Sequence, residues 1–286
     1  MPEASILLDV AYDGADFRGF APQREERTVH GVLLDALRSL DAGIRDARGA
    51  SRTDSGVHAR GQLVAFDPDR ELPPAAWQAE LNRSLPDDLV VARARVVARG
   101  FEPRFENLGK RYTYLVRPRS LRDPLDRRRA WTIPFSVDAE RMASEIHALV
   151  GTHDFRAFRR AADERVDTTR TMVHADVHGE GDLLRVTVEG TGFMYNMVRI
   201  IVGTVVEVGA GRREPGALAR AIASGNRRDL GLTAPPQGLC LERIFLPGDD
   251  DLPLAWTNVG KKRAPLGVHG GSPLTGEQKD GSSNEA

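Results

Sequence analysis

Strand and helix patterns follow each other in the same order in both halves of this chain, and this repeated order is the strongest constraint on its fold. Alternating or continuous apolar residues predict strands, and apolar residues three or four positions apart predict helices. The order in each half is strand, helix, strand, strand, helix, strand, with an additional helix at 215–225. The segments of the first half are 5–12, 28–43, 44–50, 62–66, 73–81 and 89–97, and those of the second half are 110–116, 138–151, 171–178, 183–189, 193–208 and 239–246.

A β-α-β-β-α-β order is that of a ferredoxin-like unit. We therefore expect an α/β (α+β) fold of two tandem units, whose mainly antiparallel sheets lie side by side with an active-site cleft between them. The N-terminal unit is expected over residues 1–103 and the C-terminal unit over 104–248. Residues 249–286 are predicted to form a largely disordered tail, because the chain has almost no large apolar residues from Gly260 on.

The overall charge does not point to a partner, since 40 basic residues face 41 acidic residues. The distribution of charge is more informative. Nine lysines and arginines lie between Arg104 and Arg129, where only three acidic residues oppose them. A local excess of this kind suits the phosphate backbone of a nucleic acid. A solvated surface is the other interpretation of such a charged run.

The sequence also bears on compartment and on metals. The chain has one cysteine, Cys240, which excludes an internal disulfide. The first residues lack the basic region of a signal peptide, and the longest apolar run, at 200–206, is far shorter than a membrane span. We expect a cytoplasmic protein with no membrane partner. The histidines lack cysteine or carboxylate partners at metal-ligand spacing, so we expect no metal site.

A polar segment between two strand patterns, Ser-Arg-Thr-Asp-Ser-Gly-Val-His-Ala at residues 51–59, is the strongest candidate for chemistry. Arg52 and Asp54 share a face of an extended segment because they are two residues apart, and the arginine would favour the ionised carboxylate. One interpretation is a carboxylate held charged for nucleophilic or base chemistry. The other is a tight turn in which Asp54 bonds its own backbone and Gly56 supplies a positive φ.

Residues 52–59, followed by Gly61 and Gln62, resemble the active-site signature G-R-T-D-x-G-V-H-A-x-G-Q of the tRNA pseudouridine synthases that act on the anticodon stem-loop. The match departs at Ser51, where the family usually has glycine, and the loop G-F-A-P-Q at 19–23 departs from the family's G-W-Q. Between Ile6 and Leu246, shorter segments resemble further motifs of the family in order. They are Y-D-G at 12–14, T-V-H-G-V-L at 28–33, F-E-P-R-F at 101–105, K-R-Y-T-Y at 110–114, G-T-H-D-F at 151–155, F-M-Y-N-M-V-R at 193–199 and G-L-C-L at 238–241.

The resemblance implies an isomerase that converts uridine to pseudouridine at positions 38, 39 and 40 of the tRNA anticodon stem-loop. The reaction breaks the N1 glycosidic bond, turns the base and joins C5 to the same sugar carbon, so it requires no cofactor and no metal. The target nucleotide must leave its stack and enter a pocket, at a cost of a few kcal/mol. The family is dimeric, with RNA spanning both subunits, which implies a homodimer here.

Asp54 is the residue to which the resemblance assigns catalysis. Its counterpart in the family either attacks C1′ of the sugar or removes the proton at C2′, and both roles need an ionised carboxylate. The positive neighbour is either Arg52 or Arg199, which lies in an apolar helix pattern where an unpaired guanidinium would be costly. We favour Arg199, which leaves Arg52 to fill the gap left by the extruded base or to hold phosphate. The alternative for Arg199 is a side chain whose head reaches water.

Tyr112 resembles the tyrosine with which the family contacts its substrate, where a ring can stack on uracil and a phenol can transfer a proton. The alternative is a core aromatic, a role that Tyr114 on the same strand face also fits. His58 is interpreted as a hydrogen-bonding or RNA-facing residue, with base catalysis as the alternative. We therefore place Tyr112, Arg52, His58 and Arg199 at the substrate.

Two other functions are compatible with parts of the sequence. One is a non-catalytic RNA-binding protein of two RNA-recognition-like units, which the basic segment suits, although neither half has the aromatic-rich pattern of such units. The other is a small-molecule hydrolase that uses Asp54 with His58, although the chain has no nucleophile elbow and no metal set.

Overall fold

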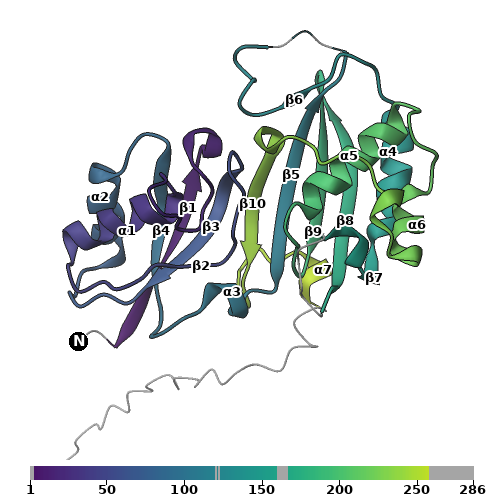
Figure 1. Ribbon diagram of the computed structural model, residues 1–286. Helices are drawn as coiled ribbons and strands as arrows, with labels where there is room; N and C mark the ends of the chain where they lie inside the picture. The colour runs from purple at the N-terminus through teal and green to yellow at the C-terminus, as the bar shows by residue number, and fades with distance from the viewer. Residues whose placement is uncertain (1–2, 120, 122, 160–166, 258–286) are drawn as a thin grey trace, which may run out of the picture.

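A computed structural model describes residues 3–119, 121, 123–159 and 167–257 (Figure 1). The strands are β1 Ala4–Tyr12, β2 Arg48–Gly49, β3 His58–Phe66, β4 Leu89–Ala98, β5 Gly109–Arg117, β6 Trp131–Thr132, β7 Gly151–Asp154, β8 Thr169–Glu180, β9 Leu183–Gly190 and β10 Leu239–Phe245. The helices are α1 Val29–Leu40, α2 Pro74–Ser84, α3 Pro103–Glu106, α4 Ala139–Ile146, α5 Met197–Gly209, α6 Ala217–Ser224 and α7 Leu254–Thr257.

Within the described residues, the strands form one sheet in the order β4-β1-β3-β10-β5-β9-β8-β7, with β2 paired to β3 and β6 to β5. The sheet divides into two sets with the same internal order, β4-β1-β3-β2 and β10-β5-β9-β8, and the neighbours within each set are antiparallel. This is the strand order expected of two ferredoxin-like units. The predicted fold class is confirmed.

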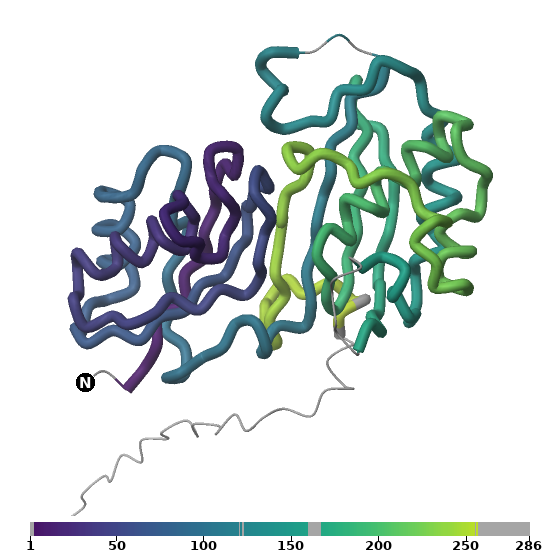
Figure 2. The backbone as a smooth tube through the Cα atoms, viewed as in Figure 1, coloured from purple at the N-terminus to yellow at the C-terminus, as the bar shows by residue number. Residues whose placement is uncertain are grey.

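The two units join along one seam, where β10 runs parallel to β3 (Figure 2). The seam pairs Cys240 with His58 and Leu241 with Ala59. β10 is the last strand of the described residues, and β3 lies in the first half of the chain. Their pairing places the segment before β3 next to the second unit. The helices α1 and α2 lie with the first unit, and α4, α5 and α6 lie with the second (Figure 1).

Local sequence explains why several elements begin and end where they do. Thr28 caps α1, because its hydroxyl accepts a hydrogen bond from the Gly31 N–H at 3.1 Å. The helix then buries Val29, Leu33 and Leu37 at helical spacing. Asp138 caps α4 in the same way, through the N–H groups of the first turn.

The strand predicted at 44–50 is wrong in extent, since only the two residues of β2 pair with β3. Ile44 and Ala47 are buried as the apolar pattern required. However, the Arg38 guanidinium donates to the carbonyls of Ile44 at 3.1 Å and Arg45 at 2.8 Å, so a side chain takes the carbonyls that a strand partner would use. The result is a loop that buries its apolar side chains, instead of a strand.

The helix predicted at 193–208 begins later than expected, at Met197. Asn196 has a φ of +60°, which is left-handed and cannot continue a right-handed helix. Residues 193–196 are therefore released from the helix and, as described below, line a cavity.

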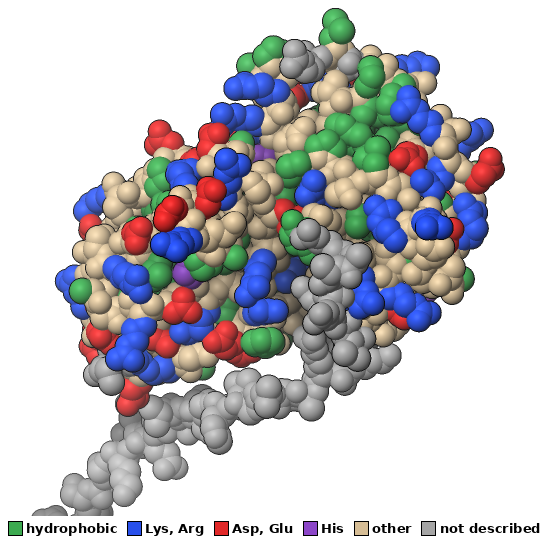
Figure 3. Space-filling model, viewed as in Figure 1, with side chains coloured by type: hydrophobic (Ala, Val, Ile, Leu, Met, Phe, Trp, Pro, Cys, Tyr) green, Lys and Arg blue, Asp and Glu red, His purple; other side chains and the backbone are tan. Residues whose placement is uncertain are grey.

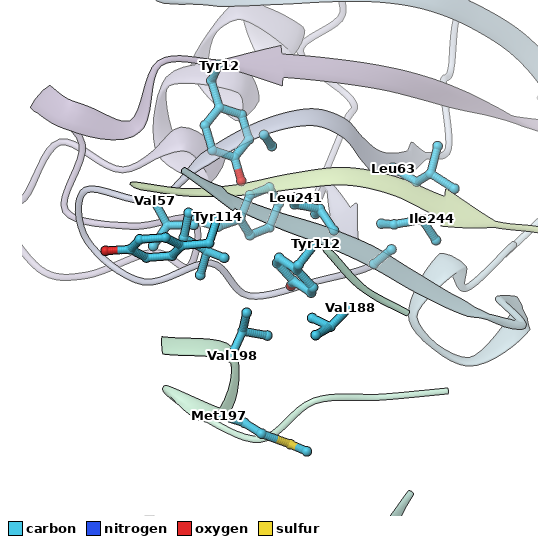
Figure 4. Close-up of a cluster of buried hydrophobic side chains, with 14 of the residues drawn as sticks. Tyr12, Val57, Leu63, Tyr112, Tyr114, Val188, Met197, Val198, Leu241 and Ile244 are labelled. Carbon is cyan, nitrogen blue, oxygen red and sulfur yellow. The ribbon is translucent and has the colours of Figure 1, made fainter. Parts of the chain in front are cut away.

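Apolar side chains of both units form one continuous core. Figure 4 shows Tyr12, Val57 and Leu63 of the first unit close to Tyr112 and Val188 of the second, with Leu241 and Ile244 of β10 among them. The seam between the units is therefore packed and not a water-filled gap. No helix in the part of the chain that the structure describes is long and apolar enough to cross a membrane.

The packed fold extends beyond the tail boundary predicted at 248. Trp256 on α7 is fully buried, its ring centroid lies 4.7 Å from that of Phe245, and its Nε1–H donates to Glu189 Oε2 at 2.8 Å. Gly109 makes room for the ring, since a Cβ at that position would lie 2.1 Å from it. Residues up to 257 thus belong to the fold, and the rest of the predicted tail, 258–286, lies outside the described residues.

We predict that Trp256→Ala lowers the free energy of unfolding by about 3–5 kcal/mol, because it empties a fully buried ring site. Trp256→Phe keeps one aromatic ring but loses part of the buried ring volume and the hydrogen bond to Glu189, so its loss should be smaller, about 1–3 kcal/mol. Urea denaturation followed by circular dichroism measures both variants. An alanine variant as stable as the unchanged protein would contradict this role for α7.

Candidate active site

A cavity of about 610 Å³ opens where the loop before β3, the strand β5, the helix α3 and the start of α5 meet. Figure 3 shows a hollow between the two units with lysine and arginine side chains beside it. The walls combine segments far apart in the sequence. They include residues 20–22, 46–54 and 193–198, together with Glu102, Arg104, Phe105, Lys110 and Tyr112.

The polar segment 51–57 is held at the cavity by a buried glutamine of β3. Gln62 is fully buried, accepts a hydrogen bond from the Ser51 N–H at 3.1 Å and donates to the Ser51 carbonyl at 2.7 Å. The side-chain amide thus takes the place of a neighbouring strand. Two residues further on, the Thr53 and Tyr12 hydroxyls lie 2.8 Å apart. These contacts fix the loop on both sides of Arg52.

The segment also forms the tight turn that the sequence predicted as an alternative. The Val57 N–H donates to the Asp54 carbonyl at 3.1 Å, and Gly56 has a φ of +79°. Gly19 packs against this turn with a φ of +93°, and a Cβ there would lie 2.9 Å from the Thr53 carbonyl. The turn and the charged site are therefore not exclusive, because the turn is what presents Asp54.

Asp54 faces an arginine of the other unit. Arg199 Nη1 lies 3.4 Å from Asp54 Oδ2, and the two side chains are only 16% and 14% exposed. The same guanidinium donates to the Ala234 carbonyl at 2.7 Å and to Asn196 Oδ1 at 2.9 Å. The predicted ion pair between Arg199 and Asp54 is confirmed. A positive charge at this distance favours the ionised carboxylate.

Arg52 lies on the cavity wall but is exposed. Within the described residues, its guanidinium has no hydrogen-bond or ion-pair partner. It is therefore available to a ligand, and it is not the arginine that contacts Asp54.

Tyr112 reaches the cavity from β5 and is 6% exposed. Its hydroxyl lies 2.9 Å from Ser51 Oγ, and its ring meets Phe193 edge to face at 5.1 Å between centroids. Burial raises the pKa of Tyr112 to about 12, an effect that the Ser51 hydrogen bond reduces and the negative charge of Asp54 reinforces. The phenol is thus protonated at neutral pH. Tyr114 instead fills the predicted core role, with its hydroxyl donating to the Pro235 carbonyl at 2.7 Å.

His58 does not line the cavity that contains Asp54. Its side chain is buried, with Nδ1 3.1 Å from the Gly14 nitrogen and Nε2 2.6 Å from the Arg128 carbonyl. The structure therefore supports the predicted hydrogen-bonding role. It does not bring His58 to Asp54, as the alternative of base catalysis would require, because β3 begins at His58 and turns it away from the loop.

Lys110 is a cavity residue that the sequence analysis missed. Its Nζ donates to the Ala50 carbonyl at 3.0 Å and to Ser51 Oγ at 3.3 Å. Burial lowers the pKa of Lys110 to about 8, and the positive charge of Arg104 acts in the same direction. The spacing held the signal, since Lys110 and Tyr112 are two residues apart on one strand and so share a face.

The family model described as tRNA pseudouridine synthase matches residues 10–106 and 146–246 of this chain. The chain belongs to the tRNA pseudouridine synthase family. The matched residues include the loop that carries Asp54 to the cavity, the segment that resembles the family's active-site signature.

Several relatives named tRNA pseudouridine synthase A support this membership. The protein of Geobacter sp. (strain M21) is 41% identical over 85% of this chain and 99% of its own length. That of Halalkalibacterium halodurans is 42% identical over 82% of this chain and 89% of its own length. That of Thermoanaerobacter sp. (strain X514) is 36% identical over 84% and 99%. In this family member, no cluster of three or more histidine, cysteine, aspartate or glutamate residues suited to a metal occurs among the described residues.

We predict that Lys110 titrates near pH 8, well below the ordinary lysine value of 10.5. Because the folded pKa is the lower one, the unfolded chain binds more protons between these two values, and the unfolding free energy should rise with pH across that window. Relative to Lys110→Met, the rise should reach about 3 kcal/mol. NMR of ¹³C-labelled lysine in both proteins measures the titration, and a Lys110 signal that titrates near 10.5 would contradict the prediction.

Proposed function

We propose that this chain converts uridine to pseudouridine in tRNA, with Asp54 as the catalytic residue. The target positions are 38, 39 and 40 of the anticodon stem-loop, which the sequence resemblance implies. The observation that carries the proposal is the position of the family signature. It places Asp54 at the cavity, 3.4 Å from the guanidinium of Arg199.

The isomerisation conserves all atoms of the nucleotide. The N1–C1′ bond breaks, the base turns, a C5–C1′ bond forms, C5 loses a proton and N1 gains one, so no electrons are exchanged with a cofactor. Asp54 either attacks C1′ or removes the C2′ proton, and both roles require the carboxylate form. Arg199 stabilises that form and is itself held by Asn196 and the Ala234 carbonyl.

The size and lining of the cavity suit one extruded nucleotide. Its volume of about 610 Å³ lies within the range typical of small-molecule sites. Phe193, Tyr195 and Phe105 are aromatic residues of the wall, and Phe105 is 68% exposed. Aromatic rings stack on unpaired bases, and exposed arginines neutralise phosphates. Arg52 supplies such an arginine on the same wall.

The oligomeric state and the compartment that we propose come from the same resemblance. We infer a homodimer with tRNA spanning both subunits, acting in the cytoplasm where tRNA is found. Four exposed arginines of the basic segment supply further contacts for the RNA backbone, and they are Arg104, Arg119, Arg127 and Arg129. Neither a non-catalytic RNA-binding protein nor a hydrolase that uses Asp54 with His58 has a specific observation in its favour, and His58 lies away from Asp54.

We expect Asp54→Asn to lose pseudouridine formation by about 10⁴-fold or more, because the amide can neither attack C1′ nor take the C2′ proton. The variant keeps the shape of the side chain, so tRNA affinity and melting temperature should stay close to the original. Tritium release from C5-labelled tRNA measures the activity. Asp35→Asn, an exposed change on α1, is the matched control and should be fully active.

The target positions are tested in cells. Pseudouridine mapping in a strain that lacks this gene should show uridine at positions 38–40 of its tRNAs. The intact gene should restore the modification and the Asp54→Asn gene should not. A strain whose tRNAs keep all their pseudouridines without the gene would end the proposal.

We expect Arg52→Ala to lower kcat/KM by about tenfold or more without changing the melting temperature, since the side chain is exposed and available to a ligand. The salt dependence distinguishes its two possible roles. A phosphate contact lowers the slope of log affinity against log salt by about 1, whereas a side chain that fills the gap of the extruded base lowers kcat and leaves the slope unchanged. Arg83→Ala, on the exposed face of α2, is the control.

A further inference from the structure

Three side chains form a continuous chain of hydrogen bonds along one wall of the cavity. Lys110 Nζ lies 3.3 Å from Ser51 Oγ, and Ser51 Oγ lies 2.9 Å from the Tyr112 hydroxyl. Ser51 and Tyr112 are only 7% and 6% exposed, so these contacts are largely shielded from solvent. The middle member is the position at which this chain departs from the family's usual glycine.

The donors and acceptors of Lys110, Ser51 and Tyr112 limit the direction in which these hydrogen bonds can run. A lysine ammonium has three donors and no acceptor, so Ser51 Oγ must accept from Lys110 while the lysine is charged. Ser51 keeps its own proton, which can be donated to the Tyr112 oxygen because either hydroxyl of this pair can be the donor. In that arrangement the Tyr112 oxygen accepts. The phenol proton is left free for an acceptor in the cavity. A neutral amine would instead accept from Ser51, which would reverse the chain and turn the phenol proton away from the cavity.

No ion pair accounts for the presence of a chargeable lysine at position 110. Among the described residues, no carboxylate lies within ion-pair distance of its Nζ, whose second contact is the Ala50 carbonyl at 3.0 Å. It is also the only lysine between residues 1 and 257, in a chain that otherwise uses arginine there. An ammonium is compact and can lose its proton, whereas a guanidinium is a wide planar fork that stays charged.

The reaction needs a hydrogen-bond donor of the kind that this chain of contacts provides. When the N1–C1′ bond breaks, its electron pair stays on the uracil and the negative charge spreads to the carbonyl oxygens. A donor already oriented towards one of these oxygens stabilises the charge as it develops.

We propose that Lys110 is a positioning residue that fixes the Tyr112 hydroxyl, through Ser51, as a hydrogen-bond donor to a carbonyl oxygen of the extruded uracil. This inference rests on the proposed function and assigns parts of it to residues other than Asp54. Lys110 touches neither the sugar nor the base in this scheme, and it acts only through Ser51.

The test compares Lys110→Met, Ser51→Ala and Lys110→Arg with the unchanged protein by tritium release between about pH 6 and 9. We expect Lys110→Met and Ser51→Ala to lower kcat about tenfold with KM changed less than about twofold, because the donor is lost only at the reacting base. The double variant should be no slower than either single variant, since both substitutions interrupt the same series of hydrogen bonds. Ser51→Ala removes no charge and therefore serves if Lys110→Met folds poorly.

The pH profile separates positioning from packing. The kcat of the unchanged protein should fall as Lys110 loses its proton, and the fall should be absent in Ser51→Ala and Lys110→Arg. Arg199 pairs with Asp54 at the cavity. The other charged or titratable groups that line it are His30 of α1, Asp46, Arg48 of β2, Arg52, Asp54, Glu102, Arg104 of α3, Tyr112 of β5 and Tyr195. All of these groups remain in Ser51→Ala. If the kcat of that variant still falls with pH, one of these groups causes the fall, and the inference is overturned.

Arg111→Met is the matched control, because Arg111 is the next residue of β5 and pairs with Glu189 at 2.7 Å, outside the cavity lining. It should keep the kcat and pH profile of the unchanged protein. Unchanged kcat and pH profile in both Ser51→Ala and Lys110→Met, with an active parent protein, would overturn this inference alone. A parent protein that forms no pseudouridine would overturn the proposed function as well.

Discussion

The contact between Asp54 and Arg199 is the interaction on which the rest of the site depends. The two residues are 145 positions apart, and each belongs to a different unit of the sheet. A guanidinium on the apolar helix α5 requires a partner, and a carboxylate kept ionised at a mostly buried position requires a positive neighbour. Each residue thus stabilises the charge of the other. The pair forms only when both units are folded and docked, so the charge state needed for chemistry follows from the fold.

The seam between β3 and β10 makes this docking possible. Its parallel pairing involves two register positions, next to the end of the signature loop. Gln62 on β3 then holds the loop through the backbone of Ser51, and Tyr12 holds it through Thr53. These contacts all lie within the first unit. The second unit supplies Tyr112, Lys110 and Arg199, so the cavity has one wall from each half of the chain.

The electrostatics of the cavity set a distinct state for each titratable group. Arg199 favours the charged form of Asp54, burial keeps the phenol of Tyr112 protonated, and burial weakens the hold of Lys110 on its proton. The neutral phenol and the charged carboxylate are consistent with one another, because a second negative charge beside Asp54 would be unfavourable. In the proposed reaction, the carboxylate of Asp54 would act as base or nucleophile and the phenol of Tyr112 as hydrogen-bond donor at the same pH.

The sequence by itself determined the order of the elements, the caps of α1 and α4 and the family signature, and it favoured Arg199 over Arg52 as the partner of Asp54. These follow from local periodicity, from residue chemistry and from the cost of an unpaired buried charge. Only the tertiary structure decided that Arg38 replaces a strand at 44–50, that His58 lies away from the cavity, and that Lys110 and Ser51 adjoin Tyr112. It also placed Trp256 in a small second cluster with Leu108 and Phe245. The reason is physical. The pattern of apolar residues along a segment depends on neighbours in the sequence, whereas contacts between residues tens of positions apart form only when the two units pack.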